Sequence, residues 1–445
     1  MAANARIAVI GAGIAGLTAA YKLKCAGHTP VVMETRDYVG GRVKSFKRGE
    51  FLFDVGAFIY LGSYDDAVEL IKEVGLGDQL GQFSAYGAMP KNGELKFFDF
   101  HKPISSILGT DYLTLGSKLK MIKLLAFLFK HWNSLNYHDA SGVAAFDNDT
   151  VQSYCMRELN EEIYEYVASV VVRGPWLSNP ADTSVGQLMW TMKNFFKPYF
   201  YGLDDGMDAL PRALAKLLDV RLECTVANVT DHKSHVDVTY TLGGKETTGA
   251  TTERFDGCII TAPTEQSLAM FPQMNAVQAE FYRNTTYISA VDTHIALRHE
   301  PSNPATYIMV SQREHADLCG VIVDHKKANK RAAPGKGMMT IFCSDEWSKA
   351  NMETPSEVLL PEVLGMLKPY YGDLTNEVED FEIARWPVVV PKMKQGRFKE
   401  IAVYEKSIDP SAKVQFAGDL DPISGVNAAL VSGKQAAARV IKQYN

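Results

Sequence analysis

The sequence predicts an α/β fold into which an α+β domain is inserted. The chain opens on a buried-strand pattern, Arg6–Ile10, followed at once by a glycine-rich turn and an Ala/Leu-rich helix. A second strand–turn–helix pattern lies near the C-terminus, from Val414 to Ala437. A long helical stretch and several β-rich segments lie between these two units. At 445 residues the chain is long enough for two domains with large cores.

The N-terminal turn, Gly11-Ala-Gly13-Ile14-Ala15-Gly16, has the glycine spacing of a dinucleotide-binding loop. Gly11 permits a tight turn, Gly13 lets the backbone approach a pyrophosphate, and Gly16 allows close helix–strand packing. The helix N-terminus adds partial positive charge for phosphates. A second strand, Pro30–Glu34, ends in a carboxylate that can accept hydrogen bonds from a ribose diol and would repel a 2′-phosphate. A Rossmann-like nucleotide site is therefore predicted, and a purely structural glycine turn is the alternative.

Beyond Glu34 the chain continues with five residues and then Gly40-Gly41-Arg42. With this spacing it resembles the flavoprotein superfamily of monoamine oxidases, protoporphyrinogen oxidases and phytoene desaturases. The resemblance implies a GR2-type FAD-binding domain, in which Gly41 passes close to the pyrophosphate and Arg42 offers it a delocalised cation. A solvated Arg in an exposed turn is the alternative.

Further segments resemble motifs of the same superfamily. Gly56-Ala57-Phe58 matches a segment beside the flavin, Val226 a contact to the adenine, and Ala262 the end of a buried strand. Gly418-Asp419 and Val426-Asn427 match the C-terminal flavin motif, where a helix N-terminus would stabilise reduced flavin. Trp386 belongs to an Arg-Trp-Pro stretch that also borders the cofactor in relatives. Because the stretch from Trp386 to Phe398 contains no Cys, FAD is expected to be non-covalent.

The resemblance divides the chain discontinuously. Residues 1–85, 201–265 and 386–445 would form the FAD-binding domain, and 86–200 and 266–385 the substrate-binding domain, with a helical part and a mixed sheet. Thr150–Val172 is expected to be one helix, and Lys326–Lys336 a solvated loop.

Two residues are candidates for catalysis. Tyr60 follows the flavin segment and either faces the ring or is an aromatic core residue. Lys392 stands where the resembled motif has Gln, with Arg397 in place of its His. Both cations would polarise a substrate carbonyl, or they point to solvent or to the FAD phosphates. The stretch Tyr287–Leu297 lacks the lysine that many amine oxidases carry there.

The resemblance implies an FAD-dependent oxidoreductase that dehydrogenates a small or medium, largely apolar cyclic substrate by hydride transfer to flavin N5, through C–C desaturation or C–N oxidation. A flavin amine oxidase acting on primary or secondary amines is the alternative, and a non-catalytic flavin-binding protein is a third possibility.

Composition limits the partners. A net charge of −6 gives no reason to expect nucleic-acid binding. Six scattered cysteines suit reduced thiols and a cytoplasmic location. No metal is expected, since His232 and His235 have no evident acidic partner.

Lys118–Trp132 is apolar with interspersed lysines, which favours a core helix, with attachment to a membrane surface as the alternative. The sequence does not indicate an oligomeric state.

Overall fold

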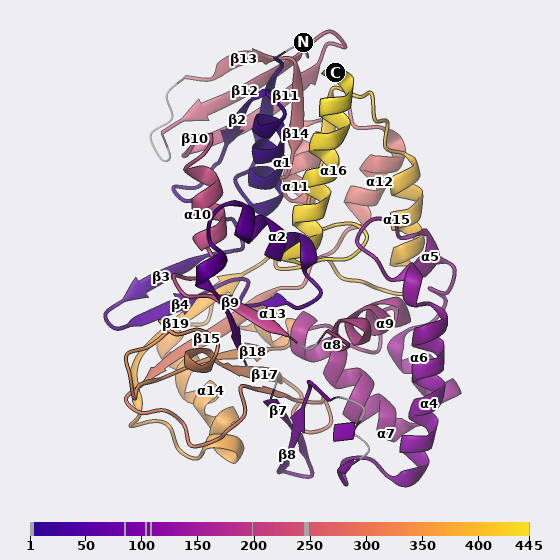
Figure 1. The fold of residues 1–445 in the computed structure, drawn as a ribbon, viewed down its shortest axis with the longest axis vertical. Coiled ribbons are helices and arrows are strands. Elements are labelled where there is room, and N and C mark those ends of the chain that lie inside the picture. Colours follow the sequence, from indigo (N-terminus) through magenta and orange to yellow (C-terminus); the bar gives the residue numbers. More distant parts are fainter. Residues whose placement is uncertain are drawn as a thin grey trace.

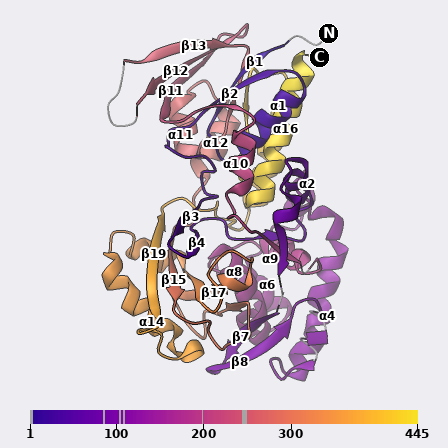
Figure 2. The same cartoon turned by 60° about the vertical axis from the view of Figure 1, so that its left-hand side comes forward.

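A computed structural model describes residues 4–83, 86–102, 105–106, 109–197, 199–243 and 249–444. The ribbon has an upper part that contains both termini and a lower part that combines a sheet with a group of helices (Figure 1). The same two parts are evident after rotation (Figure 2). The predicted α/β fold with an α+β second part is confirmed.

The upper part is organised by a parallel five-stranded sheet, in the order β10-β2-β1-β14-β20. The apolar runs that predict buried strands occupy its centre, where Ile7 pairs with Pro30 on one side and with Gly257 on the other. Helices α1 and α16 pack so closely that a Cβ on Gly433 would lie 2.3 Å from the carbonyl oxygen of Ala15. The strands are β1 (Arg6–Ile10), β2 (Thr29–Met33), β10 (Asp219–Arg221), β14 (Gly257–Ile260) and β20 (Val414–Phe416).

An antiparallel sheet, β11-β12-β13, extends this part and carries the segment after β10. Its strands are β11 (Cys224–Asp231), β12 (Val236–Leu242) and β13 (Thr251–Phe255). The helices of the upper part are α1 (Ile14–Cys25), α2 (Asp65–Glu73), α10 (Ala209–Ala215), α11 (Thr264–Met270), α12 (Ala276–Asn284), α15 (Arg397–Lys406) and α16 (Val426–Tyr444).

The lower part contains a mixed seven-stranded sheet, in the order β19-β15-β18-β17-β16-β7-β8, in which only the β16–β7 pairing is parallel among the described strands. Helix α14 (Ser356–Tyr371) packs on the sheet beside α13 (Asp345–Ala350). The strands are β7 (Tyr86–Lys91), β8 (Glu94–Asp99), β15 (Ala290–Leu297), β16 (Tyr307–Met309), β17 (Leu318–Val323), β18 (Gly337–Cys343) and β19 (Val378–Trp386). The predicted domain boundaries agree with this distribution of strands, but they remain predictions.

The helical group of the lower part lies beside this sheet (Figure 2). The expected helix over 150–172 begins as predicted, with Thr150 capping the backbone N–H of Ser153. It does not continue, because Leu159 leaves helical geometry and Asn160 caps a new start. The helices are α4 (Leu115–Lys130), α5 (Ser141–Ala144), α6 (Val151–Glu158), α7 (Glu161–Ile163), a π-helical segment (Tyr164–Ala168), α8 (Ser169–Trp176) and α9 (Val185–Asn194).

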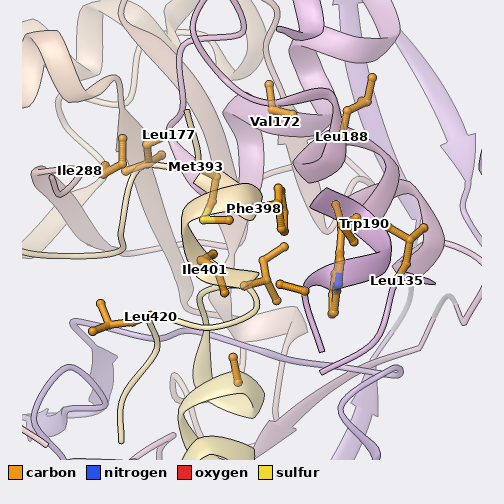
Figure 3. Close-up of a cluster of buried hydrophobic side chains, with 14 of the residues drawn as sticks. Leu135, Val172, Leu177, Leu188, Trp190, Ile288, Met393, Phe398, Ile401 and Leu420 are labelled. Carbon is orange, nitrogen blue, oxygen red and sulfur yellow. The ribbon is translucent and has the colours of Figure 1, made fainter. Parts of the chain in front are cut away.

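Two small sheets join the parts. One is the hairpin of β3 (Ser45–Arg48) and β4 (Phe51–Asp54), in which Arg48 pairs with Phe51 across the turn. The other sheet joins β5 (Tyr60–Leu61), β9 (Phe200–Leu203) and β6 (Leu80–Phe83). A shared apolar core also ties α15 to the helical group: Phe398 of α15 lies between Met393 and Trp190, a residue of α9, and Ile401 of α15 belongs to the same cluster (Figure 3).

The expectation that Lys326–Lys336 is solvated is wrong. Lys327 and Arg331 are fully buried, and each contacts Oδ2 of Asp54, at 2.8 and 2.9 Å. Lys327 also contacts Asp324 at 2.8 Å. Although burial opposes the charge of Asp54, the two cations lower the pKa of this carboxyl to about 2. The segment is therefore a structural bridge between the seven-stranded sheet and the β3–β4 hairpin.

None of the helices in the described part of the chain has the length and the continuous apolar character needed to cross a bilayer.

Candidate cofactor and active site

A cavity of about 670 Å³ runs along the carboxyl ends of β1 and β2 and continues toward the seven-stranded sheet. Glu34 and Val226 line one end, and Phe58 and Trp386 line the other. This is the place where open parallel sheets bind ligands, in the crevice outside the carboxyl ends of the strands.

The glycine turn forms the middle of the cavity wall. Gly11 has a φ of +102°, which favours glycine, and its N–H donates to the carbonyl of Met33 at 2.8 Å. A Cβ on Gly13 would meet no described atom within 4 Å, so this position is open toward the cavity. A Cβ on Gly16 would lie 2.0 Å from the carbonyl oxygen of Gly11. The geometry thus requires glycine for the turn at Gly11 and for the close packing at Gly16, and the approach of a pyrophosphate to Gly13 stays a prediction.

Glu34 lies at the end of β2 with its carboxylate buried in the cavity wall. Oε2 accepts the backbone N–H of Ala12 at 2.7 Å, and Oε1 accepts that of Arg36 at 2.9 Å. The backbone of Cys224 donates to the carbonyl of Glu34 at 2.8 Å, which brings β11 and Val226 to the same end. The carboxylate is thus fixed where a ribose diol would meet it.

Arg42 and Asp419 form a two-pronged ion pair across the cavity wall, with N–O distances of 2.9 and 2.8 Å. Burial opposes the charge of Arg42, but Asp419 outweighs this effect and raises its pKa. The pair holds a fixed cation beside the glycine turn, since Gly41 approaches Gly13.

The opposite end of the cavity is apolar and tightly built. A Cβ on Gly56 would lie 2.1 Å from the carbonyl oxygen of Arg42, so only glycine fits there. The indole N–H of Trp386 donates to the carbonyl of Val55 at 2.5 Å. Phe58 packs on Phe342 with ring centroids 4.6 Å apart. A flat aromatic group fits between such surfaces.

The predicted cofactor residues line this cavity with two exceptions. Gly16 acts through packing, and Asn427 is fully buried, with its amide oxygen accepting the N–H of Ala67 at 3.0 Å. The lining residues among the predictions are Gly11, Gly13, Ile14, Ala15, Glu34, Gly41, Arg42, Gly56, Ala57, Phe58, Val226, Ala262, Trp386, Gly418, Asp419 and Val426.

The structure does not support Tyr60 as a catalytic residue. Its side chain is fully buried in the core of the upper part and does not line the cavity. The hydroxyl donates to the carbonyl of Met207 at 3.3 Å, and burial raises its pKa far above the ordinary value. The alternative stated for this residue, an aromatic core position, is what the structure has.

Lys392 and Arg397 also lie away from the cavity. Lys392 pairs with Asp345, which raises its pKa although burial opposes the charge. Arg397 lies over the ring of Phe281 at 3.9 Å and donates to Thr285. Because both cations are engaged elsewhere, the expectation that they polarise a substrate carbonyl is wrong.

Two features of the site were missed. Asp292 of β15 lines the cavity although it lies in an apolar strand, and the acid inside that run was the available signal. A second, smaller chamber of about 80 Å³ is lined mainly by apolar and aromatic side chains, including Phe195, Phe200 and Tyr307. Phe58 and Phe342 line both spaces, so the chamber lies beside the apolar end of the cavity.

The expectation that His232 and His235 lack an acidic partner is wrong. Asp237 lies 3.2 Å from His232 and 3.5 Å from His235, and one ligand atom of each residue lies within 4.8 Å of the others. The group is on the β11–β12 hairpin, away from the residues that line the cavity.

The fold thus combines a parallel sheet that has a cavity at the carboxyl ends of its strands with a second, apolar chamber beside that cavity. The chain belongs to the family of flavin-containing amine oxidoreductases, whose model matches residues 14–441. The family implies a flavin cofactor, and the open cradle at Gly13, the fixed Glu34 and the narrow apolar end fit one.

Individual relatives have different chemistries. The chain is 36% identical to 15-cis-phytoene desaturase of Synechococcus elongatus over 128 residues, which is 26% of this chain and 27% of that protein. It is 29% identical to mitochondrial protoporphyrinogen oxidase of Nicotiana tabacum over 204 residues, 44% of this chain and 38% of that one. The chain thus matches well under half the length of these curated relatives. The solved structure of putrescine oxidase bound to putrescine has the same fold, with a TM-score of 0.81, 17% identity and coverage of 98% and 99% of the two chains.

Proposed function

We propose that the protein is an FAD-dependent oxidoreductase that dehydrogenates a small or medium, largely apolar cyclic substrate, at a C–C or a C–N bond. The observation that carries this proposal is the apolar chamber beside the cavity. Bound FAD would accept a hydride at N5, and a ring seated in the chamber would present its C–H to the apolar end of the cavity.

Each end of the cavity supports FAD in a distinct way. Glu34 and Val226 would hold the adenosine, the N-terminus of α1 and Arg42 the pyrophosphate, and Gly56 and Trp386 the ring system. Among the described cysteines only Cys224 lines the cavity, at the end with Glu34, and all six thiols are free. These observations favour non-covalent binding, and free thiols favour a reducing compartment such as the cytoplasm.

A flavin amine oxidase is the second candidate, and Asp292 favours it. A buried carboxylate facing the cavity would attract a substrate ammonium group. The candidates therefore differ in the charge of the substrate at its reacting end.

The purified protein is expected to be yellow and to release FAD into the supernatant when it is precipitated with acid. Mixed anaerobically with a panel of uncharged cyclic compounds and of amines, it is expected to lose its flavin absorbance with the former. Colour retained in the precipitate would contradict non-covalent binding, and recovery of NAD would contradict the cofactor. Bleaching by amines alone would favour the amine oxidase, and no bleaching would indicate a flavin-binding protein without this activity.

We also propose that α4 rests on an anionic membrane surface. Its buried face includes Leu124 and Leu128, as expected for a core helix, but Leu115, Leu119, Ile122 and Phe129 form an exposed stripe, with exposures from 53% to 75%. The helix carries four lysines and no acidic residue. Lys118 and Lys120 donate to the carbonyls of Thr110 and Leu159, and Lys123 pairs with Glu158. The positive charge of the helix itself favours anionic lipid over a second copy of the same helix.

The position of this stripe suggests a role in substrate supply. Phe129 contacts Phe196 with ring centroids 5.4 Å apart, and the preceding residue, Phe195, lines the apolar chamber. An apolar substrate dissolved in the lipid would therefore reach the protein at the exposed stripe of α4, close to the apolar chamber.

The protein is expected to co-sediment with vesicles that contain phosphatidylglycerol, more weakly at high salt, and the double change Leu119→Ser/Ile122→Ser is expected to reduce binding at least ten-fold through lost apolar burial. Val358→Ser, an exposed apolar residue on α14, is the matched control and should bind like the wild type. Equal binding of both variants, or a dimer that only the double change breaks, would contradict the proposal.

A further inference from the structure

Asp292 lies where the cavity meets the apolar chamber. It belongs to β15, where it pairs with Ala384 of β19, the strand that ends at Trp386. On its other side Asp292 adjoins β18, which runs antiparallel to β15. Because Thr293 pairs with Ile341, the neighbouring position of the register places Phe342 opposite Asp292. Phe342 lines both spaces. The carboxyl group therefore borders the place where the proposed substrate would meet the flavin.

The carboxyl group of Asp292 is buried without compensation. The residue is 6% exposed, and Oδ1 is buried with no hydrogen-bond partner among the described residues. In contrast, the buried acids Asp54 and Asp324 are paired with Lys327, and the buried Asp345 is paired with Lys349 and Lys392. An unpaired buried carboxyl is costly to the fold, which is a recurrent property of functional sites.

The groups that face Asp292 do not neutralise it. The titratable neighbours on the adjoining strands are the thiols of Cys319 on β17 and Cys343 on β18, whose pKa values are raised by burial first and by Asp292 in addition. Arg385 on β19 points to Ser356 and Thr354 instead. Desolvation raises the pKa of Asp292 to about 7, so the group exchanges a proton near neutral pH.

We propose that Asp292 is the general base of the reaction, an inference that rests on the proposed oxidoreductase function. The substrate loses a hydride from one atom and a proton from the atom next to it, and a double bond forms between the two. A bound flavin would supply the hydride acceptor, and a carboxylate oxygen of Asp292 would take the proton. An external two-electron acceptor, such as dioxygen, closes the cycle, and the proton leaves to solvent. A substrate with an acidic C–H or N–H beside its reacting carbon fits this role.

The test uses the flavin-loaded protein and three variants. Asp292→Asn keeps the shape but cannot take up a proton, Asp292→Glu keeps the base, and Asp380→Asn alters a partly exposed acid of β19. With the best substrate of the anaerobic panel, Asp292→Asn is expected to slow flavin reduction by about 10²- to 10⁴-fold at saturating substrate. Asp292→Glu should recover part of the rate, and Asp380→Asn should match the wild type. The wild-type rate should rise with pH through about 7, and this rise should be absent in Asp292→Asn.

A second readout does not depend on activity. Because the pKa of Asp292 is raised in the folded state, the folded protein keeps this carboxyl group protonated at pH values where the unfolded chain, above about pH 4, has lost the proton. The wild type therefore loses more stability than Asp292→Asn as the pH rises toward 7, since the other buried carboxyls that titrate in this range, such as Glu405 and Asp421, are common to both proteins. The urea midpoint of the variant is expected to exceed that of the wild type at pH 8, and the difference should shrink at pH 5.

The possible outcomes distinguish the role of Asp292 as a base from the proposed oxidoreductase function. A wild type that is reduced normally, with Asp292→Asn equally fast, would overturn the base and leave the oxidoreductase intact. A variant that only raises the KM for cationic amines would also overturn it, since Asp292 would then be a counter-ion. A difference in urea midpoint between Asp292→Asn and the wild type that is the same at pH 5 and at pH 8 would contradict the titration of Asp292. A wild type that no compound reduces would overturn the oxidoreductase and the base together.

Discussion

Replacing Lys327 by methionine is expected to lower the free energy of unfolding by about 3–5 kcal/mol, because it removes the cation that pairs with the buried Asp324 and leaves the buried Asp54 with Arg331 alone. Lys327 contacts Asp54 and Asp324 at 2.8 Å each, and its side chain has no exposure to solvent. Asp54 additionally accepts hydrogen bonds from the hydroxyl of Ser45 and from the backbone N–H of Met207. The loss of Lys327 therefore affects the segments that contain Ser45, Asp54 and Met207 together.

The same loop supplies the control. Lys330 pairs with Asp205 at 2.9 Å, but both side chains are largely exposed. Lys330→Met is therefore expected to leave the denaturation midpoint close to that of the wild type. The measurement is the denaturation midpoint of the two variants under identical conditions. If Lys327→Met were as stable as Lys330→Met, the buried network would contribute nothing to the fold.

The flavin content gives an independent check of the same change. Asp54 precedes Val55, whose carbonyl accepts the indole N–H of Trp386 at the apolar end of the cavity. Loosening Asp54 is thus expected to weaken flavin binding, and Lys330→Met should leave it unchanged.

The parts of the site that the sequence predicts correctly are those in which neighbouring residues determine each other's position. Gly11, Gly13 and Gly16 form one turn, and Glu34 ends the strand beside it, so spacing alone indicates their roles. The motifs at Gly56 and at Gly418-Asp419 are equally local. Backbone geometry and short-range order are enough to predict such segments.

The residues that were placed wrongly depend on distant packing. Tyr60 and Lys327 follow local patterns typical of a cofactor contact and of a solvated loop, yet both are buried by segments far away in sequence. Whether Lys392 reaches the cavity depends on Asp345, 47 residues earlier. Asp292 was missed for the same reason, since nothing in β15 alone indicates which of its faces meets the cavity.

Alanine substitutions at two glycines of the same turn are expected to have different effects, one on flavin binding and the other on stability. At Gly13 a Cβ would meet no described atom within 4 Å, and the helix-capping geometry, with a φ of −72°, suits any residue. Gly13→Ala should therefore leave the flavin-free protein as stable as the wild type, within about 0.5 kcal/mol. Its methyl group would occupy the space of the pyrophosphate and weaken flavin binding by about ten- to a hundred-fold, the effect of overpacking by one methyl group.

Gly16→Ala adds the same methyl group three residues later, but there it meets the protein itself. The Cβ would lie 2.0 Å from the carbonyl oxygen of Gly11 and 3.0 Å from Oγ1 of Thr261, so α1 must move away from β1 and β14. The flavin-free protein is expected to lose about 1–3 kcal/mol. Denaturation of the flavin-free proteins and titration with FAD, followed by quenching of its fluorescence, measure the two effects separately. Unchanged FAD affinity in Gly13→Ala would mean that the pyrophosphate lies elsewhere. Unchanged stability in Gly16→Ala would mean that the helix and the sheet are packed less closely than the structure has them.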